Sequence, residues 1–135
     1  MKTHEEITGE IIGRAMKVHR TLGHGFLESV YQKALFHESR KSGLKVQGEK
    51  PVAVLYDGVG VGGFSADLLV EDQIIVELKA VERLCKAHEV QTVNYLTATG
   101  LDIGLLINFG AESLEFKKKF GLRHAPNPVN PVNPV

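Results

Sequence analysis

The sequence predicts a single α/β domain in which helices flank a central mixed β-sheet. Three observations lead to this fold class. Apolar residues follow helical spacing before residue 43, extended apolar segments dominate residues 46–79, and a further helix near 88–99 separates two strand segments. A helix between two strands acts as a crossover and makes those strands parallel, whereas short turns join antiparallel strands.

Composition limits the class of protein. The chain has 135 residues, is 43% hydrophobic and carries no net charge, which fits one domain with a single core. The neutral net charge argues against a protein that coats nucleic acid through charge alone. A nucleic-acid enzyme is still possible, because a bound metal ion would add positive charge that the residue count omits. The lone Cys85, the lack of a signal peptide and the lack of an apolar run of ~20 residues predict a soluble, cytoplasmic protein without membrane contact.

Two N-terminal helices are predicted from capping residues and apolar spacing. Residues 3–6 have the form of a capping box, and the helix that follows is expected to end near Gly23. The second helix is expected to begin around Gly25 to Leu27 and to end at Gly43. Its predicted apolar stripe comprises Leu27, Val30, Tyr31, Ala34 and Leu35.

The strands are predicted from alternation and turn signals. A strand ends at the Asp57-Gly58 turn, and strands at 64–70 and 74–79 are joined by a turn on Glu71-Asp72. A helix closed by Gly100 then leads to a buried strand at 103–109 and an edge strand at 114–120. The three lysines of that last strand, residues 117–119, alternate in direction. They are predicted to keep this edge strand solvated, so that it does not pair with another chain and aggregate.

Charged residues inside two of these apolar strands point to chemistry. Asp67 lies in one strand, and Glu77 and Lys79 share a face of the next because side chains alternate. The short turn would bring Asp67 beside that pair. Two carboxylates suit a hard divalent cation, with the Leu78 main-chain carbonyl as a third oxygen ligand. Taken alone, the hairpin also permits a solvated aspartate beside an exposed Glu–Lys pair.

Helix positions add further candidates. Glu28 and Tyr31 lie three residues apart on one face of the second helix. Glu28 is either part of the site or a glutamate favoured by the helix dipole, and Tyr31 is predicted to be a core residue. His88, Gln91 and Tyr95 share a face of the third helix, where His88 is expected to be a capping or surface residue. No phosphate-binding glycine loop, zinc cluster or serine or cysteine nucleophile signature is present, and no cofactor-binding residue is predicted.

The order of these residues resembles the PD-(D/E)xK nuclease superfamily: Asp67, then Glu77-x-Lys79, then a helix with Gln91 and Tyr95. Segments 25–31 (GFLESVY), 66–70 (ADLLV), 76–80 (VELKA) and 104–110 (GLLINFG) are similar to the signature of its GxxExxY family. The resemblance covers about residues 4–122, so the expected domain is 1–122. Ser65 departs from the pattern, because the family often has a basic residue there.

The resemblance implies a restriction-endonuclease-like α/β sandwich that hydrolyses phosphodiester bonds of DNA, or of RNA, by metal-activated water. It implies that Asp67 and Glu77, with the Leu78 carbonyl, bind Mg²⁺ or Mn²⁺. Gln91 and Tyr95 would contact nucleic acid. The full set of implied catalytic residues is Asp67, Glu77, Lys79, Glu28 and Gln91.

A second hypothesis keeps this fold without catalysis. The protein would then be a self-assembling or partner-binding module, as its neutral charge and lack of a target-selecting domain suggest. Residues 123–135 contain Asn-Pro-Val three times, which predicts an extended or disordered tail, with docking to another copy or a partner as the alternative. Because a bare nuclease core usually needs a partner copy for affinity, a homo-oligomer is expected.

Overall fold

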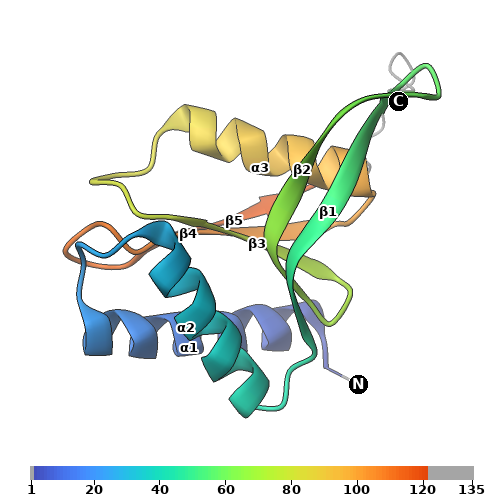
Figure 1. Cartoon of the computed structure of the whole chain (residues 1–135). Helices are drawn as coiled ribbons and strands as arrows, with labels where there is room; N and C mark the ends of the chain where they lie inside the picture. The colour runs from blue at the N-terminus through green and yellow to red at the C-terminus, as the bar shows by residue number, and fades with distance from the viewer. Residues whose placement is uncertain (1, 122–135) are drawn as a thin grey trace.

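A computed structural model describes residues 2–121, so the predicted tail at 123–135 lies outside the described residues. Figure 1 shows a sheet with α3 on one face and two helices on the other. The predicted α/β sandwich with a mixed sheet is confirmed. The elements in chain order are α1 (His4–Leu22), α2 (Glu28–Lys41), β1 (Val46–Tyr56), β2 (Val59–Val70), β3 (Ile74–Lys79), α3 (Lys86–Thr99), β4 (Ile103–Asn108) and β5 (Glu115–Phe120).

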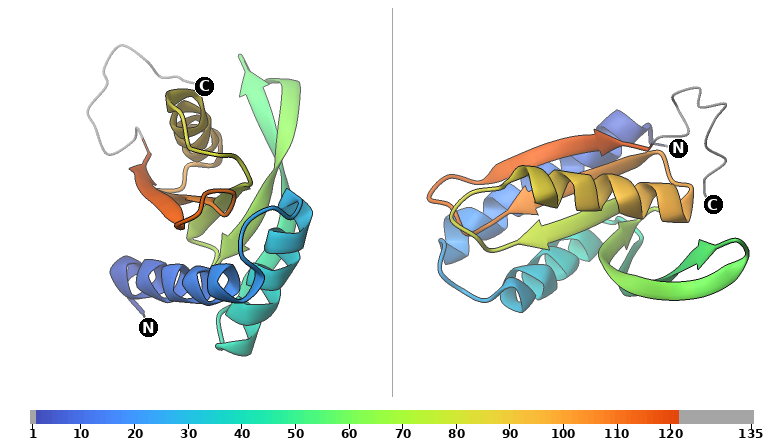
Figure 2. Two further views of the ribbon diagram at one scale, coloured as in Figure 1. Left: turned by 90° about the vertical axis from the view of Figure 1, so that its left-hand side faces the viewer. Right: turned by 90° about the horizontal axis from the view of Figure 1, so that it is seen from above.

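The five strands are ordered β1-β2-β3-β4-β5. Among the strands of residues 2–121, only β3 and β4 pair in parallel, and α3 is the crossover between them, as predicted. The other three pairs are antiparallel. Figure 2 shows the resulting layers, with α3 alone above the sheet and α1 and α2 below it. None of the helices within residues 2–121 is long and apolar enough to cross a membrane.

The larger core lies on the face covered by α1 and α2. The predicted capping box at Thr3 and Glu6 opens α1, whose buried side chains pack toward the sheet. Inward-pointing residues of the central strands complete this cluster because alternate strand residues share a face. Its members include Ile7, Ile11, Tyr31, Leu35, Leu68, Val76, Leu78, Leu105 and Phe109.

The face covered by α3 holds a much smaller apolar cluster, centred on Ala66, Ile75 and Leu96. Gly104 allows the close approach of this helix. A Cβ at that position would lie 3.2 Å from the Thr92 side chain and 3.4 Å from the Leu96 side chain.

Several predicted boundaries were wrong. Helix α2 begins at Glu28, and Leu27 and Val30 are 77% and 36% exposed rather than part of the buried stripe. Leu27 is the N-cap residue with extended backbone, and Val30 lies beside the buried stripe that Tyr31, Leu35 and Ser39 form at intervals of four residues. Strand β2 is longer than predicted, and α3 begins at Lys86, two residues earlier than expected.

Strands β1 and β2 form a hairpin that projects from the body (Figures 1 and 2). They pair up to Tyr56 and Val59, whereas β2 pairs with β3 only at Leu68, Leu69 and Val70. Asp57 and Gly58 have φ angles of 55° and 77°, as a type I′ turn requires, which confirms the predicted turn. The exposed apolar side chains near the tip are Leu55, Tyr56, Val59 and Val61.

Candidate metal centre at the end of strand β3

The candidate site begins where the pairing of β2 with β3 stops. Beyond the Leu68–Val76 pair, side chains take the place of ladder hydrogen bonds. The Asp67 N–H donates to Glu77 Oε2 at 3.2 Å, and the Leu78 N–H donates to Asp67 Oδ2 at 2.8 Å. The two predicted carboxylates are thus each held by the main chain of the opposite strand. The turn on Glu71 and Asp72, both with positive φ, creates this register.

The same geometry orients the Leu78 carbonyl. The N–H and C=O groups of one strand residue point to the same side of the strand. Since the Leu78 N–H faces Asp67, its carbonyl faces the side that β2 has left. The next carbonyl, of Lys79, points the other way and accepts from the Phe109 N–H at 2.8 Å. The predicted role of Leu78 as a main-chain ligand is compatible with this orientation.

Both carboxylates are costly to ionise. Glu77 is only 5% exposed. Its burial, followed by the nearby Asp67 charge, raises the pKa of Glu77 to about 8. Burial also raises the pKa of Asp67, while the hydrogen bond from Leu78 and the charge of Lys79 oppose that change. A cation between the two groups would remove the repulsion and replace the lost hydration.

The donor atoms fit a hard divalent cation. Asp67 Oδ1 and Glu77 Oε1 receive no hydrogen bond from any residue in the described part of the chain. Carboxylate oxygens are the ligands that Mg²⁺ and Mn²⁺ prefer. Residues 2–121 contain no group of three or more His, Cys, Asp or Glu side chains that could hold a metal ion. The candidate centre therefore consists of two carboxylates and a main-chain carbonyl.

Helix α3 brings Gln91 and Tyr95 to the same centre. Lys79 Nζ donates to Gln91 Oε1 at 3.3 Å. Tyr95 stacks on Phe64 with 3.6 Å between ring centroids. Burial and then the charges of Glu77 and Asp67 raise the pKa of Tyr95, while the Gln91 side chain opposes them. One face of the Tyr95 ring is therefore already covered by Phe64.

Glu28 approaches the centre from the opposite helix layer. The residue as a whole is exposed on the first turn of α2. Partial burial and then the Asp67 charge raise the pKa of Glu28, while the Lys79 charge opposes them. No hydrogen bond joins Glu28 to either residue within the described chain. Glu28 is therefore a charged group at the rim of the candidate centre.

Tyr31 holds the loop that leads to Glu28. Its side chain is fully buried and stacks on Phe109, as the prediction of a core residue requires. The Tyr31 hydroxyl donates to the Gly23 carbonyl at 2.7 Å and accepts from the Phe26 N–H at 3.2 Å. Gly25, between these contacts, has φ of 115°, which favours glycine.

Two residues near Asp67 were not predicted from the sequence. Gln32 Nε2 donates to the Asp67 carbonyl at 3.0 Å, and its position one helical turn after Glu28 was a signal that could have identified it. Glu49 is absent from the ladder between the Gly48–Leu68 and Lys50–Ala66 pairs and has φ of 48°. Its charge also raises the pKa of Asp67. No local sequence pattern indicates this interaction.

Asn108 fixes the segment that follows Lys79. Its Oδ1 accepts from the N–H groups of Val81 and Gly110, both at 3.0 Å, and its Nδ2 donates to the Val81 carbonyl and to Glu115, both at 2.8 Å. A Cβ at Gly110 would collide with the Val81 main chain.

The predicted capping role of His88 at the start of α3 is confirmed, since its Nδ1 accepts from the Cys85 N–H.

A family model of the PD-(D/E)XK nuclease superfamily matches residues 5–119. The chain belongs to this superfamily. It is also similar to the crystal structure of SSO0001, with 12% sequence identity and a TM-score of 0.47. That match covers 87% of this chain and 62% of SSO0001, so the chain spans less than two thirds of that protein. No curated protein matches the chain.

Proposed function

We propose that this superfamily member is a metal-dependent nuclease that hydrolyses phosphodiester bonds of DNA, or of RNA. The observation that carries the proposal is the pair of carboxylates, Asp67 and Glu77, held against each other where β2 leaves β3. A nearly buried glutamate beside an aspartate is unfavourable for an empty structural site and favourable for a cation site. Superfamily membership supports the same conclusion.

Asp67, Glu77 and the Leu78 carbonyl would hold Mg²⁺ or Mn²⁺. When bound, the ion would supply Lewis-acid polarisation of the scissile phosphate and acidify a water molecule. The hydrogen bonds from Asp67 and Leu78 N–H groups orient the two carboxylates before any ligand arrives. Preorganised ligands need little rearrangement when they bind.

Lys79 would act on the phosphate and on the attacking water. Its ammonium group is positioned by the Gln91 amide and would stabilise negative charge on the phosphate oxygens. Gln91, through its contact with Lys79, would hold this side of the nucleic-acid strand. Glu28 would orient water at the rim, and the exposed part of Tyr95 would contact the sugar-phosphate backbone.

The assignment to the GxxExxY family is part of the proposal. Each of its three defining positions has a physical purpose here: Gly25 adopts a positive φ, Glu28 lies within electrostatic range of Asp67, and the Tyr31 hydroxyl fastens the loop. These purposes explain the spacing of the motif without requiring that Tyr31 touch a substrate.

The test compares cleavage of labelled single- and double-stranded DNA and RNA by wild type, Asp67→Asn and Lys79→Met, with Mg²⁺ or Mn²⁺. Calorimetry of Mn²⁺ binding accompanies each assay. We expect Asp67→Asn to lose both binding and cleavage, because it removes a ligand charge. Lys79→Met should bind Mn²⁺ and lose cleavage. A wild-type protein that binds Mn²⁺ and cuts none of these substrates would refute the proposal.

The exposed apolar tip of the β1–β2 hairpin supports the second candidate function, a self-assembling module. Leu55 is 54% and Tyr56 73% exposed, and within residues 2–121 β1 has a neighbouring strand on one side alone. Such edges pair readily with another chain. If assembly is the function, light scattering will show a defined oligomer that Tyr56→Ser dissociates. A wild-type monomer at micromolar concentration would reject this candidate.

A further inference from the structure

We propose that the cavity between α2 and the base of the β1–β2 hairpin binds one nucleotide of an unpaired strand, next to the scissile phosphate. This inference rests on the proposed nuclease function and specifies its substrate class. The cavity has a volume of about 400 Å³. Its lining residues are Gln32, Lys33, Phe36, Gly48, Glu49 and Leu68.

The cavity adjoins Asp67 of the candidate metal centre through two of its lining residues. Gln32 lines it and donates to the Asp67 carbonyl at 3.0 Å. Glu49 lines it and lies beside Asp67 on the neighbouring strand. On α2, Glu28, Gln32 and Phe36 follow one another at intervals of one helical turn, so they form a stripe from the centre into the cavity.

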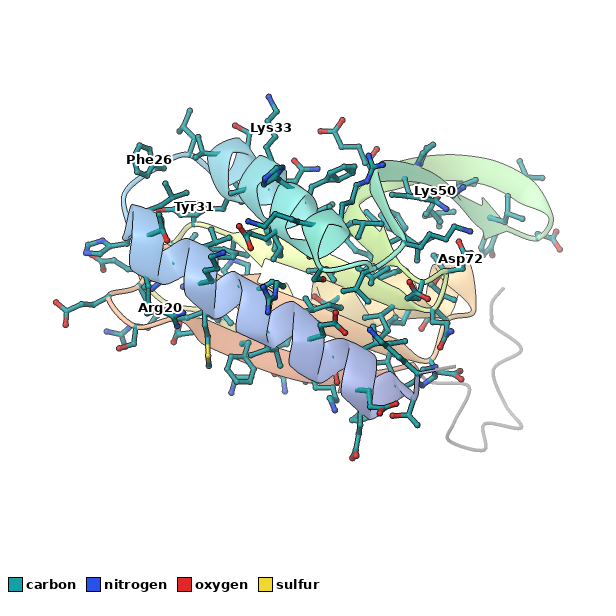
Figure 3. All side chains as sticks on the ribbon, turned by 90° about the horizontal axis from the view of Figure 1, so that it is seen from below. Arg20, Phe26, Tyr31, Lys33, Lys50 and Asp72 are labelled. Carbon is teal, nitrogen blue, oxygen red and sulfur yellow. The ribbon has the colours of Figure 1, made fainter. Side chains whose placement is uncertain are left out.

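The lining offers the chemistry that a nucleotide needs. Phe36 presents an aromatic ring, with the Arg40 guanidinium 5.5 Å from its centroid. Within residues 2–121, no hydrogen bond or ion pair engages the Lys33 ammonium, the Glu49 carboxylate or Gln32 Oε1. Figure 3 shows Lys33 projecting from α2 into solvent. Amide and carboxylate groups read base edges, aromatic rings stack on bases, and a lysine at the rim contacts phosphate.

The surroundings favour an unpaired strand over a duplex. A cavity of about 400 Å³ between a helix and a hairpin accommodates one nucleotide rather than a double helix. Duplex interfaces are extended and strongly positive. Lys50 is the only basic residue between positions 46 and 78, so the hairpin presents no such surface.

The test uses a substitution whose side chain occupies the cavity. Gly48 has no positive φ, and a Cβ there would lie 3.7 Å from the Phe36 ring, so Gly48→Val projects into the space without backbone strain. Gly60→Val is the matched control, since it lies on the neighbouring strand with nothing within 4 Å of the added Cβ. Binding of a labelled single-stranded oligonucleotide is measured by fluorescence anisotropy without metal, and KM and kcat are measured with Mn²⁺.

We expect Gly48→Val to weaken single-strand binding about tenfold and to raise KM by a similar factor, the effect of losing one base–aromatic contact. Mn²⁺ affinity, kcat and the melting temperature should match those of Gly60→Val. Phe36→Leu should weaken single-strand binding in the same way, whereas Phe36→Tyr keeps an aromatic ring and should bind like wild type. These two variants test the inference even if Gly48→Val does not fold. Unchanged binding in Gly48→Val or in Phe36→Leu overturns the inference. If wild type binds no strand and cuts none, the proposed function itself fails.

Discussion

The two ends of β3 differ in their neighbours and therefore in their chemistry. Ile74, Ile75 and Val76 pair with β2 on one side and β4 on the other, and all three are buried and apolar. From Glu77 to Lys79 the strand keeps β4 but loses β2. Here the Asp67 carboxylate, rather than a strand, accepts from the Leu78 N–H.

This difference shows how a buried polar site forms within an apolar sheet. Where both neighbours are present, main-chain hydrogen bonds are satisfied by the ladder, and side chains only need to pack. Where one neighbour departs, free N–H groups can hold carboxylates in place. Three predictions test this contrast and a fourth tests the loop before α2, from the largest expected effect to the smallest.

Asp67→Asn should lower cleavage by roughly 10³-fold, as expected for a preorganised group that acts on transition-state charge. The amide oxygen can still accept from the Leu78 N–H, so the melting temperature should change little. Asp72→Asn, at the turn that joins the same strands, is the matched control and should cut at the wild-type rate. Equal losses in both variants would contradict a role specific to the end of β3.

Glu77→Gln should stabilise the metal-free protein at high pH. Because the pKa of Glu77 rises from 4.5 to about 8 on folding, the folded state holds a proton that the unfolded chain has lost in this range. The free energy of unfolding therefore falls as pH rises from 4.5 to 8. One pKa unit corresponds to about 1.4 kcal/mol, so the rise of Glu77 sets an upper bound of ~5 kcal/mol on the gain above pH 8.

Urea unfolding in EDTA, measured from pH 5 to 9 for both proteins, checks this expectation. The difference between the two curves isolates Glu77 from carboxylates such as Glu115, whose pKa is lowered and which act at lower pH. Parallel curves across the whole range would show that Glu77 ionises normally in the folded protein.

Ile74→Ala tests the fully paired end of β3. The side chain is completely buried in the larger core, so the substitution should lower the free energy of unfolding by about 3 kcal/mol. Cleavage per folded molecule should remain at the wild-type level, because Ile74 lies at the opposite end of β3 from Lys79. Chemical denaturation combined with an activity assay checks both statements, and a selective loss of activity would argue against separate roles for the two ends.

Tyr31→Phe should have the smallest effect, about 1 kcal/mol of stability, because it removes one hydroxyl with two hydrogen bonds and keeps the stacked ring. Hydrogen exchange of the Phe26 amide should become faster, since that N–H loses its acceptor. Tyr95→Phe is a suitable comparison, and its Phe26 exchange should match wild type. An unchanged Phe26 amide in Tyr31→Phe would show that the loop does not depend on this hydroxyl.

Local patterns in the sequence were sufficient to predict most of the fold and the centre of the candidate site. Turn residues at Asp57-Gly58 and Glu71-Asp72 set the two hairpins, and alternation then places Glu77 and Lys79 on one face. The positions of Gln91 and Tyr95 follow from helical spacing in the same way. These features depend on neighbours within a few residues, which the sequence shows directly.

Tertiary structure alone decided how far β2 stays paired with β3, how deeply Glu77 is buried and which residues surround Asp67. Gln32 and Asp67 are 35 residues apart, yet they share a hydrogen bond. Leu27 and Val30 have apolar side chains at helical spacing and are nonetheless exposed. Such outcomes depend on which elements pack together, and packing sums many distant contacts that no short segment of sequence contains.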